Sequence, residues 1–378
     1  MDLKDFKAGR LAQGYQYRYF LPEKINHGFY WTDEGINELL ERASLRLGEL
    51  NSFSRFVPDT DMFIRMHIYK EAVVSSRIEG TRTNIKEALV VESEIDPENR
   101  DDWREVNNYV AAMNAALDEL SRLPLSNRLI RETHRILLSS GRGEQKTPGE
   151  FRVSQNWIGG ASLADAVFIP PAHTELPELL GDLEAFLHNS GVKLPHLIRI
   201  AIAHYQFETI HPFLDGNGRI GRLLITLYLV SSGVLEKPLL YLSDFFEHNK
   251  GLYYDNLTRV RERNDLGQWI KFFLTGIIQT AERSVGNLKR ITDLKATIEK
   301  DRILLMGKRS RQGLELLHGL FKNPVVSVKA VQERTGLSPK AANDLVAAFT
   351  DKGILVETTG FQRNRMFVFA EYLKLFSD

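Results

Sequence analysis

A glycine-containing turn joins two strongly helical segments near the middle of the chain. Apolar residues recur at helical spacing over 194–210 and again over 218–232, so both segments are predicted to be helices. Pro212 cannot continue the first helix, which places His211 at its end, facing the turn. Gly216 and Gly218 allow the backbone to turn tightly and to approach a ligand. The turn therefore presents a histidine and accessible backbone where two helices meet.

The side chains of residues 211–222 favour a polyphosphate ligand. The second helix begins directly after the turn, so its free N–H groups and the positive end of its dipole point into the turn. Arg219 and Arg222 are three residues apart, on one face of this helix. Asp215 is a hard carboxylate of the kind that binds Mg²⁺ together with phosphate oxygens, and His211 is a candidate base. The segment thus combines a base, a metal ligand, an anion cradle and two cations.

Residues 211–222 have three other interpretations, and each requires different residues or structure around the turn. Its glycine spacing is that of a dinucleotide-binding turn, but such a turn follows a strand, and a helix is predicted here. A zinc site could use the nearby histidines, although the HExxH spacing is absent. A purely structural turn with solvated arginines would leave its Asp, Asn and His unexplained. The residues concerned are Gly216, Gly218 and Gly221 for the first interpretation, and His196, His204 and His211 for the second.

Residues 211–222 resemble the motif of the Fic family, HxFx(D/E)GNGRxxR. Every defined position matches, at His211, Phe213, Asp215, Gly216, Asn217, Gly218, Arg219 and Arg222. The resemblance extends to the preceding AHYQFETI and covers about residues 1–300. It implies a mainly α fold, with an all-helical Fic core and a β-hairpin flap at about 152–171. It also implies the transfer of AMP from ATP to a Ser, Thr or Tyr hydroxyl of a target protein.

The resemblance assigns roles within the motif. It implies that His211 is the general base for the target hydroxyl, since an imidazole with an ordinary pKa of about 6.5 suits that proton. Asp215 would hold Mg²⁺ on the α- and β-phosphates. Arg219 and Arg222 would bind the β- and γ-phosphates as bidentate forks. Backbone and amide donors would cradle the phosphate oxygens, at Gly216, Asn217 and Gly218.

Outside the motif, the resemblance implies two further contacts. Asn249 and Tyr254 would touch the adenine of ATP, although packing or helix capping explains both residues equally well. The hairpin at 152–171 would bind a segment of the target protein by strand addition. A purely structural hairpin remains the alternative for any single residue within it.

A second motif lies upstream, at the end of a predicted helix. Residues 75–80 resemble the inhibitory motif [S/T]xxxE[G/N] of Fic proteins, with Ser75, Glu79 and Gly80 at its defined positions. The resemblance implies that Glu79 pairs with Arg222 and so occupies the guanidinium meant for the γ-phosphate. The alternative is a solvated glutamate at a helix end.

The chain is predicted to have four parts. Residues 1–100 form a helical regulatory region with an extended arm and an inhibitory helix at about 61–80, and residues 101–285 form the catalytic core. A connecting helix at 286–307 leads to a winged-helix domain at 308–378. In this domain Arg363 and Arg365 are the candidate phosphate contacts of the wing. Its charges nearly balance, which favours protein docking over DNA binding.

Composition excludes several classes of chemistry. The chain has no cysteine, so disulfides, thiolate metal sites and a cysteine nucleophile are excluded. Its 49 basic residues equal its 49 acidic ones, so its net charge is zero. We expect a cytoplasmic protein without a membrane span. Two alternatives for its function stay open: removal of AMP with Glu79 positioning a water, and a DNA-binding regulator that senses nucleotide. A homo-oligomer is also left open.

Overall fold

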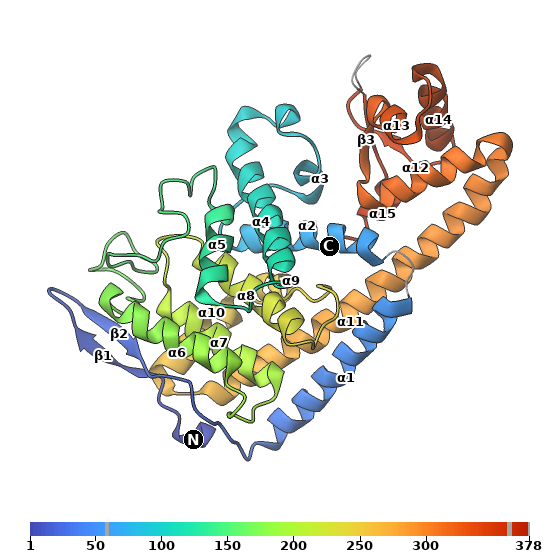
Figure 1. Ribbon diagram of the computed structural model, residues 1–378. Helices are drawn as coiled ribbons and strands as arrows, with labels where there is room; N and C mark the ends of the chain where they lie inside the picture. Colours follow the sequence, from blue (N-terminus) through green and yellow to red (C-terminus); the bar gives the residue numbers. More distant parts are fainter. Residues whose placement is uncertain (57–59, 361–364, 377–378) are drawn as a thin grey trace.

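The computed structural model describes residues 1–56, 60–360 and 365–376 of the chain (Figure 1). Within these residues the protein is mainly α, with two small sheets, as predicted. Short helical turns connect the larger elements: η1 (Leu3–Asp5), α3 (Ile85–Ala88), η2 (Glu92–Glu94), η3 (Pro97–Asn99) and η4 (His173–Glu175). In the described part of the chain, none of the helices combines the length and the apolar composition needed to cross a membrane.

Two long helices run side by side along one edge of the molecule (Figure 1). These are α1 (Glu34–Phe56) and α11 (Leu266–Ile298). We predicted a break in α11 near residue 285 and a separate connecting helix over 286–307, and this was wrong. Val285, Leu288 and Ile291 continue the buried face of α11, and no proline interrupts it. A π-helical turn, η5 (Glu299–Ile303), and a 3-10 segment, η6 (Leu304–Arg309), extend the rod further.

A central pair of helices carries the glycine-containing turn. In α7 (His196–Ile210) every side chain from Leu197 onward is buried, and α8 (Asn217–Ser231) is buried over most of its length. A helix that is buried on all sides must lie in the interior of a domain. The surrounding helices are α2 (Thr60–Ile78), α4 (Arg100–Glu119), α5 (Asn127–Leu137), α6 (Leu176–His188), α9 (Ser243–His248) and α10 (Lys250–Arg263).

The predicted extended arm is a two-stranded antiparallel hairpin. Strand β1 (Gly9–Gln13) pairs with β2 (Arg18–Pro22) in the register Gly9 to Pro22. The hairpin lies against residues 152–171: the N–H of Phe20 donates to the carbonyl of Ile169 at 2.9 Å, and its ring packs against Phe168. This arm therefore supports the flap from one side.

The flap at 152–171 is a hairpin with little strand structure. A single bridge joins Ile158 to Phe168, and the N–H groups of Val167 and Phe168 both donate to the carbonyl of Ile158. Gly159 and Gly160 adopt positive φ where the chain turns. The flap is thus a loop held by its base and by one bridge.

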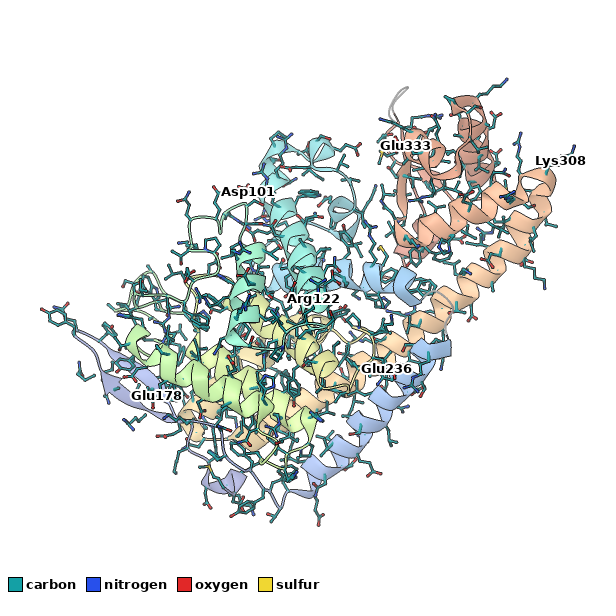
Figure 2. All side chains as sticks on the ribbon, viewed as in Figure 1. Asp101, Arg122, Glu178, Glu236, Lys308 and Glu333 are labelled. Atoms are coloured by element: carbon teal, nitrogen blue, oxygen red, sulfur yellow. The ribbon has the colours of Figure 1, made fainter. Side chains whose placement is uncertain are left out.

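The chain reverses direction at Gly307, whose φ of 61° and ψ of −124° are not helical. Lys308 marks this turn at the far end of the rod in Figure 2. We call residues 310–376 the C-terminal unit. Its elements are α12 (Ser310–Lys322), β3 (Val325–Ser327), α13 (Val328–Thr335), α14 (Pro339–Asp351), β4 (Val356–Glu357), β5 (Met366–Val368) and α15 (Ala370–Leu373). The three strands form an antiparallel sheet in the order β3-β5-β4.

Candidate functional site

His211 caps the C-terminus of α7 in the left-handed conformation. Its φ is 50°, and its N–H donates to the carbonyl of Phe207 at 2.9 Å. A left-handed backbone is unfavourable for a residue other than glycine, so the surroundings must hold it in place. Burial lowers the pKa of His211 to about 4, with a smaller contribution from the positive charge of Arg152. The imidazole is therefore neutral at pH 7 and able to accept a proton.

The side chain of Asn217 fixes the shape of the turn. Its Oδ1 accepts from the N–H of Phe213, and its Nδ2 donates to the carbonyl of the same residue, both at 2.8 Å. The prediction assigned this amide to the phosphate oxygens, but the structure uses it inside the turn. Gly216, with φ of 75°, completes the turn in a conformation that only glycine adopts without strain.

His134 supports the turn from α5 and was not predicted. Its Nδ1 accepts from the N–H of Gly149 at 2.9 Å, so its Nε2 carries the proton and donates to the carbonyl of Asp215 at 3.0 Å. The ring stacks on Phe213 with centroids 3.7 Å apart. Burial lowers the pKa of His134 to about 4, which keeps this arrangement neutral. Its partners are backbone atoms distant in sequence, so no local pattern indicates this role.

Arg152 joins the base of the flap to the end of α7. It is 2% exposed, and its guanidinium donates to the carbonyls of Ile210, His211, Ser154 and Pro171. Two of these carbonyls lie at the C-terminus of α7, where the negative end of the helix dipole favours a cation. Burial lowers the pKa of Arg152 to about 10, which still leaves it charged at pH 7.

Asn156 adds to this clamp from the same limb of the flap. Its Nδ2 donates to the carbonyl of Phe213 at 2.9 Å and to that of His211 at 3.3 Å. The flap and the residues that carry the histidine are therefore one hydrogen-bonded structure.

The guanidinium of Arg222 is buried and paired with the end of α2. Its Nη2 donates to Oε1 of Glu79 at 2.6 Å and to the carbonyl of Ser75 at 2.9 Å, and its Nε donates to Oγ of Ser75 at 2.9 Å. Desolvation raises the pKa of Glu79, but the charge of Arg222 and the hydrogen bond from it outweigh that effect, so the net pKa is lowered. Glu79 is therefore ionised at neutral pH.

The carboxylate of Glu79 lies directly over the first turn of α8. A methyl group on Gly218 would collide with Oε1 of Glu79 and come within 2.9 Å of Nη1 of Arg222. The N-terminus of a helix attracts anions, and the carboxylate of Glu79 takes an anion position there. Because Gly218 has no side chain, an anion has room at this position.

Arg219 points to a different set of acidic partners from Arg222. It is 3% exposed, and its guanidinium lies 3.5 Å from Oε2 of Glu105 on α4 and 3.5 Å from Oδ1 of Asp215. The binding of the β- and γ-phosphates by these two arginines stays a prediction. Arg219 holds the turn against α4, whereas Arg222 faces the end of α2.

Asp215 is the candidate metal ligand, and its side chain is 42% exposed. Its Oδ1 accepts from the N–H of Gly216 at 2.6 Å. Across residues 1–56, 60–360 and 365–376, no group of three or more His, Asp or Glu side chains could hold a metal. A single accessible carboxylate still fits Mg²⁺, which is usually bound by one or two carboxylates together with substrate phosphates.

The two residues predicted to contact adenine differ in their surroundings. Nδ2 of Asn249 donates to the carbonyl of Phe245 at 2.9 Å, which favours the capping role between α9 and α10. Tyr254 is 42% exposed, and burial together with the charge of Glu79 raises its pKa to about 12. Tyr254 therefore borders the same site as Glu79.

The histidines of the zinc interpretation have separate partners. His196 faces the hydroxyl of Tyr228 at 2.8 Å. His204 lies in the core between the carbonyl of Gly221 and the hydroxyl of Tyr253, each at 2.9 Å. These contacts explain both histidines as structural.

The fold and the turn define a class: a helical protein with an anion-binding turn between two buried helices and a flap beside it. Family models agree, matching the Fic/DOC family N-terminal region at residues 37–118 and the Fic/DOC family at residues 124–229. The chain belongs to the Fic/DOC family.

Curated relatives and solved structures are consistent with this assignment. The protein adenylyltransferase Fic of Aedes aegypti is 29% identical over 253 residues, which are 64% of this chain and 47% of the relative. That of Culex quinquefasciatus is 32% identical over 213 residues, 54% of this chain and 38% of the relative. The chain thus spans less than half the length of these relatives.

Two solved structures share the fold. A Fic family protein from Desulfovibrio desulfuricans matches with a TM-score of 0.59 at 21% identity, covering 90% of this chain and 97% of that one. A Fic domain containing signaling protein from Bacteroides thetaiotaomicron matches with a TM-score of 0.53 at 20% identity, covering 68% and 97%.

Proposed function

We propose that this chain is a protein adenylyltransferase that transfers AMP from ATP to a hydroxyl of a target protein, and that Glu79 inhibits it. The observation that carries the proposal is the carboxylate of Glu79 on Arg222, directly over the helix N-terminus beside His211. An anion already occupies the position where the terminal phosphate of a nucleotide would bind. The names of the curated relatives support the reaction type.

The chemical step requires a base and a stabilised phosphate. The neutral imidazole of His211 accepts the proton of the target hydroxyl while the hydroxyl oxygen attacks the α-phosphorus. The new O–P bond forms as the bond between the α-phosphorus and the bridging oxygen breaks, and pyrophosphate leaves. The first N–H groups of α8 stabilise the charge on the phosphate oxygens, so most of the rate comes from positioning and electrostatics.

Inhibition follows from competition for one guanidinium. Both N–H groups of Nη2 of Arg222 are used, one on Glu79 and one on the carbonyl of Ser75, so a γ-phosphate can bind this nitrogen only when Glu79 leaves. While Glu79 holds this position, the phosphates are displaced and the α-phosphorus is misaligned. Mg²⁺ held by Asp215 would neutralise phosphate charge when it is bound. Arg219 would then help to keep Asp215 in place.

The target protein would bind along the flap, as the resemblance implies. Val153 and Val167 are 84% and 80% exposed on opposite limbs of the flap, which leaves apolar side chains free for a target segment. Because Arg152 and Asn156 connect the flap to residues 210–213, a docked segment would be fixed relative to His211.

We infer a winged-helix fold for the C-terminal unit, supported by its order of helices and strands. Arg365, a predicted phosphate contact, is engaged within the unit, since it donates to Oδ1 of Asn343 at 2.8 Å and lies 3.6 Å from Glu357. Arg363 lies outside the described residues. These contacts favour docking to protein over DNA.

The test is incubation of the purified chain with α-labelled ATP, Mg²⁺ and lysate proteins. Glu79→Gly should raise labelling at least about tenfold, because a charge-assisted hydrogen bond is worth about 1.5–3 kcal/mol. His211→Ala should abolish labelling in either background. Glu98→Gly, which removes an exposed glutamate outside the site, is the matched control. No label with Glu79→Gly would refute the transfer reaction, and Glu79-dependent loss of AMP from a modified protein would support the reverse reaction instead.

A further inference from the structure

Helix α2 carries a row of contacts that runs from the C-terminal unit to the anion-binding turn. Four of its residues lie on α2 at every fourth position, Phe63, His67, Glu71 and Ser75, and Glu79 follows in the turn after the last residue of the helix, Ile78. Each step of four along the helix turns the direction of the side chain by about 40° and advances it by about 6 Å. From Phe63 to Ser75 the row therefore winds about 120° around the helix over about 18 Å. The row thus connects the C-terminal unit at one end of α2 with the anion-binding turn at the other.

The N-terminal half of α2 lies beside α12 of the C-terminal unit (Figure 1), and aromatic rings meet there. Phe63 meets Phe321 of α12 edge-on, with centroids 5.9 Å apart, and His67 meets Phe376 edge-on at 5.2 Å. Phe63, Phe321 and Phe376 are all buried. Edge-on aromatic pairs are directional, so these contacts fix the position of α2 as well as covering it.

The middle of α2 is fixed by a buried carboxylate beside a small pocket. Oε1 of Glu71 accepts from the hydroxyl of Tyr109 on α4 at 3.0 Å and from the hydroxyl of Ser243 on α9. The pocket, of about 60 Å³, is open to the surface and is lined by residues that include His67, Glu71, Tyr241 and Asp244. Nε2 of His67 is buried without a hydrogen-bond partner among the described residues. Because Glu71 fixes the middle of α2 to α4 and α9, a displacement of the N-terminal half tilts the helix about this point. The rings of the C-terminal unit hold that half in place.

The opposite end of α2 holds the inhibitory contact. Ser75 and Glu79 bind Arg222 through the three hydrogen bonds described above. Within a regular helix, the backbone hydrogen bonds keep the relative positions of such residues fixed. A shift of α2 at Phe63 is consequently transmitted to Ser75. It also reaches Glu79, because the N–H of Glu79 donates to the carbonyl of Ser76 at 3.0 Å in the turn that follows the helix.

The C-terminal unit lies where it can shift α2, because the chain doubles back at Gly307. It is joined to the core through the rod of α11, η5 and η6, and Arg302 of η5 donates to Glu371 of α15 at 3.1 Å. From there α12 and Phe376, which follows α15, reach α2. The unit thus bridges the end of α11 and the N-terminal half of the helix that ends directly before Glu79.

We propose that the C-terminal unit is part of the inhibitory device. Phe321 and Phe376 act as positioning residues that hold α2 so that Glu79 stays on Arg222. Weakening this contact releases Glu79 and raises AMP transfer, and a partner that draws the C-terminal unit away from α2 would activate the protein. The inference rests on the proposed adenylyltransferase function for its activity readout, but not for its structural readout.

The test compares Phe376→Ala with Phe376→Leu in the full chain, because Phe376 belongs to the C-terminal unit and its loss should leave the helices around the turn folded. Phe376→Ala should raise labelling from α-labelled ATP about fivefold to tenfold, a usual size for coupling between sites, and Phe376→Leu should raise it less. Hydrogen exchange of the amides of residues 72–79 should become faster in the same order. In a Glu79→Gly background, Phe376→Ala should add nothing.

The control is Val346→Ala, which shortens a buried side chain of α14 on the outer side of the C-terminal unit (Figure 1). It should leave both labelling and the exchange of residues 72–79 unchanged. Unchanged exchange in Phe376→Ala and in Phe321→Ala would overturn the inference, as would an equal gain of labelling with and without Glu79. If Glu79→Gly transfers no AMP, the proposed function fails, and the exchange measurement still decides whether the C-terminal unit holds α2.

Discussion

Removing Glu79 should make the protein less stable while it makes the site more accessible. Arg222 is 2% exposed on its side chain, and Glu79→Gly would take away the carboxylate 2.6 Å from its Nη2. A hydrogen bond to a charged group is worth about 1.5–3 kcal/mol. The side chain of Glu79 is 36% exposed, so solvent screens the pair and the lower end applies, about 1.5 kcal/mol. The remaining bonds from Arg222 to Ser75 keep the loss from being larger.

The assay is urea unfolding of the wild type and of Glu79→Gly, with and without ATP and Mg²⁺, followed by the fluorescence of the four tryptophans, among which Trp269 is fully buried. The variant should unfold at lower urea without nucleotide. ATP at a hundredfold excess over its Kd should restore about 2.7 kcal/mol to the variant, and less to the wild type, where Glu79 competes. Equal stability of the two proteins, or equal stabilisation by ATP, would refute the competition for Arg222.

The difference in stability between the wild type and Glu79→Gly should decrease at low pH. The folded-state pKa of Glu79 is lowered from the ordinary value of 4.5. Its contribution to stability is therefore fully present above pH 4.5 and is lost as the pH falls through the folded-state pKa. The difference between the wild type and Glu79→Gly should stay constant from pH 7 to about pH 5 and shrink only below that.

Three further predictions concern groups around the turn. In a Glu79→Gly background, kcat/KM for AMP transfer should fall on the acid side only near pH 4, because the lowered pKa of His211 keeps the base neutral above that; a midpoint near 6.5 would contradict this. Arg152→Met should cost about 2–3 kcal/mol in urea unfolding, since it strips buried carbonyls of their donor; a loss below about 0.5 kcal/mol would speak against the clamp. His134→Leu should lower kcat about tenfold through a looser turn, whereas equal kcat would show that the turn holds without it.

The helices around the turn could be predicted well because their information is local. Apolar spacing and Pro212 define the end of α7, and Gly216 marks the tight turn before α8. The approach of Glu79 to Arg222, 143 residues apart, was predicted only through the resemblance to a family motif. No periodicity within the chain brings these two residues together.

The supporting residues could not be predicted from the sequence. Arg152 and His134 bind backbone atoms, and every residue offers the same carbonyl and N–H groups, so neither a spacing nor a charge pattern marks the partners. The break predicted near residue 285 failed for a related reason. A change to more polar composition was interpreted as a boundary, whereas the buried face through Val285 and Leu288 runs on without interruption.

The clamp at the base of the flap has a consequence for redesign of target choice. If the target binds along the flap, as we propose, exchanging flaps between relatives would redirect the protein to a new target. Here Arg152 and Asn156 belong to the flap in sequence, yet their hydrogen bonds hold the backbone of residues 210–213. A graft that replaces them would alter the setting of His211 together with the docking surface. A transferable recognition segment therefore begins after Asn156, within residues 157–169, and leaves both clamp residues with their host.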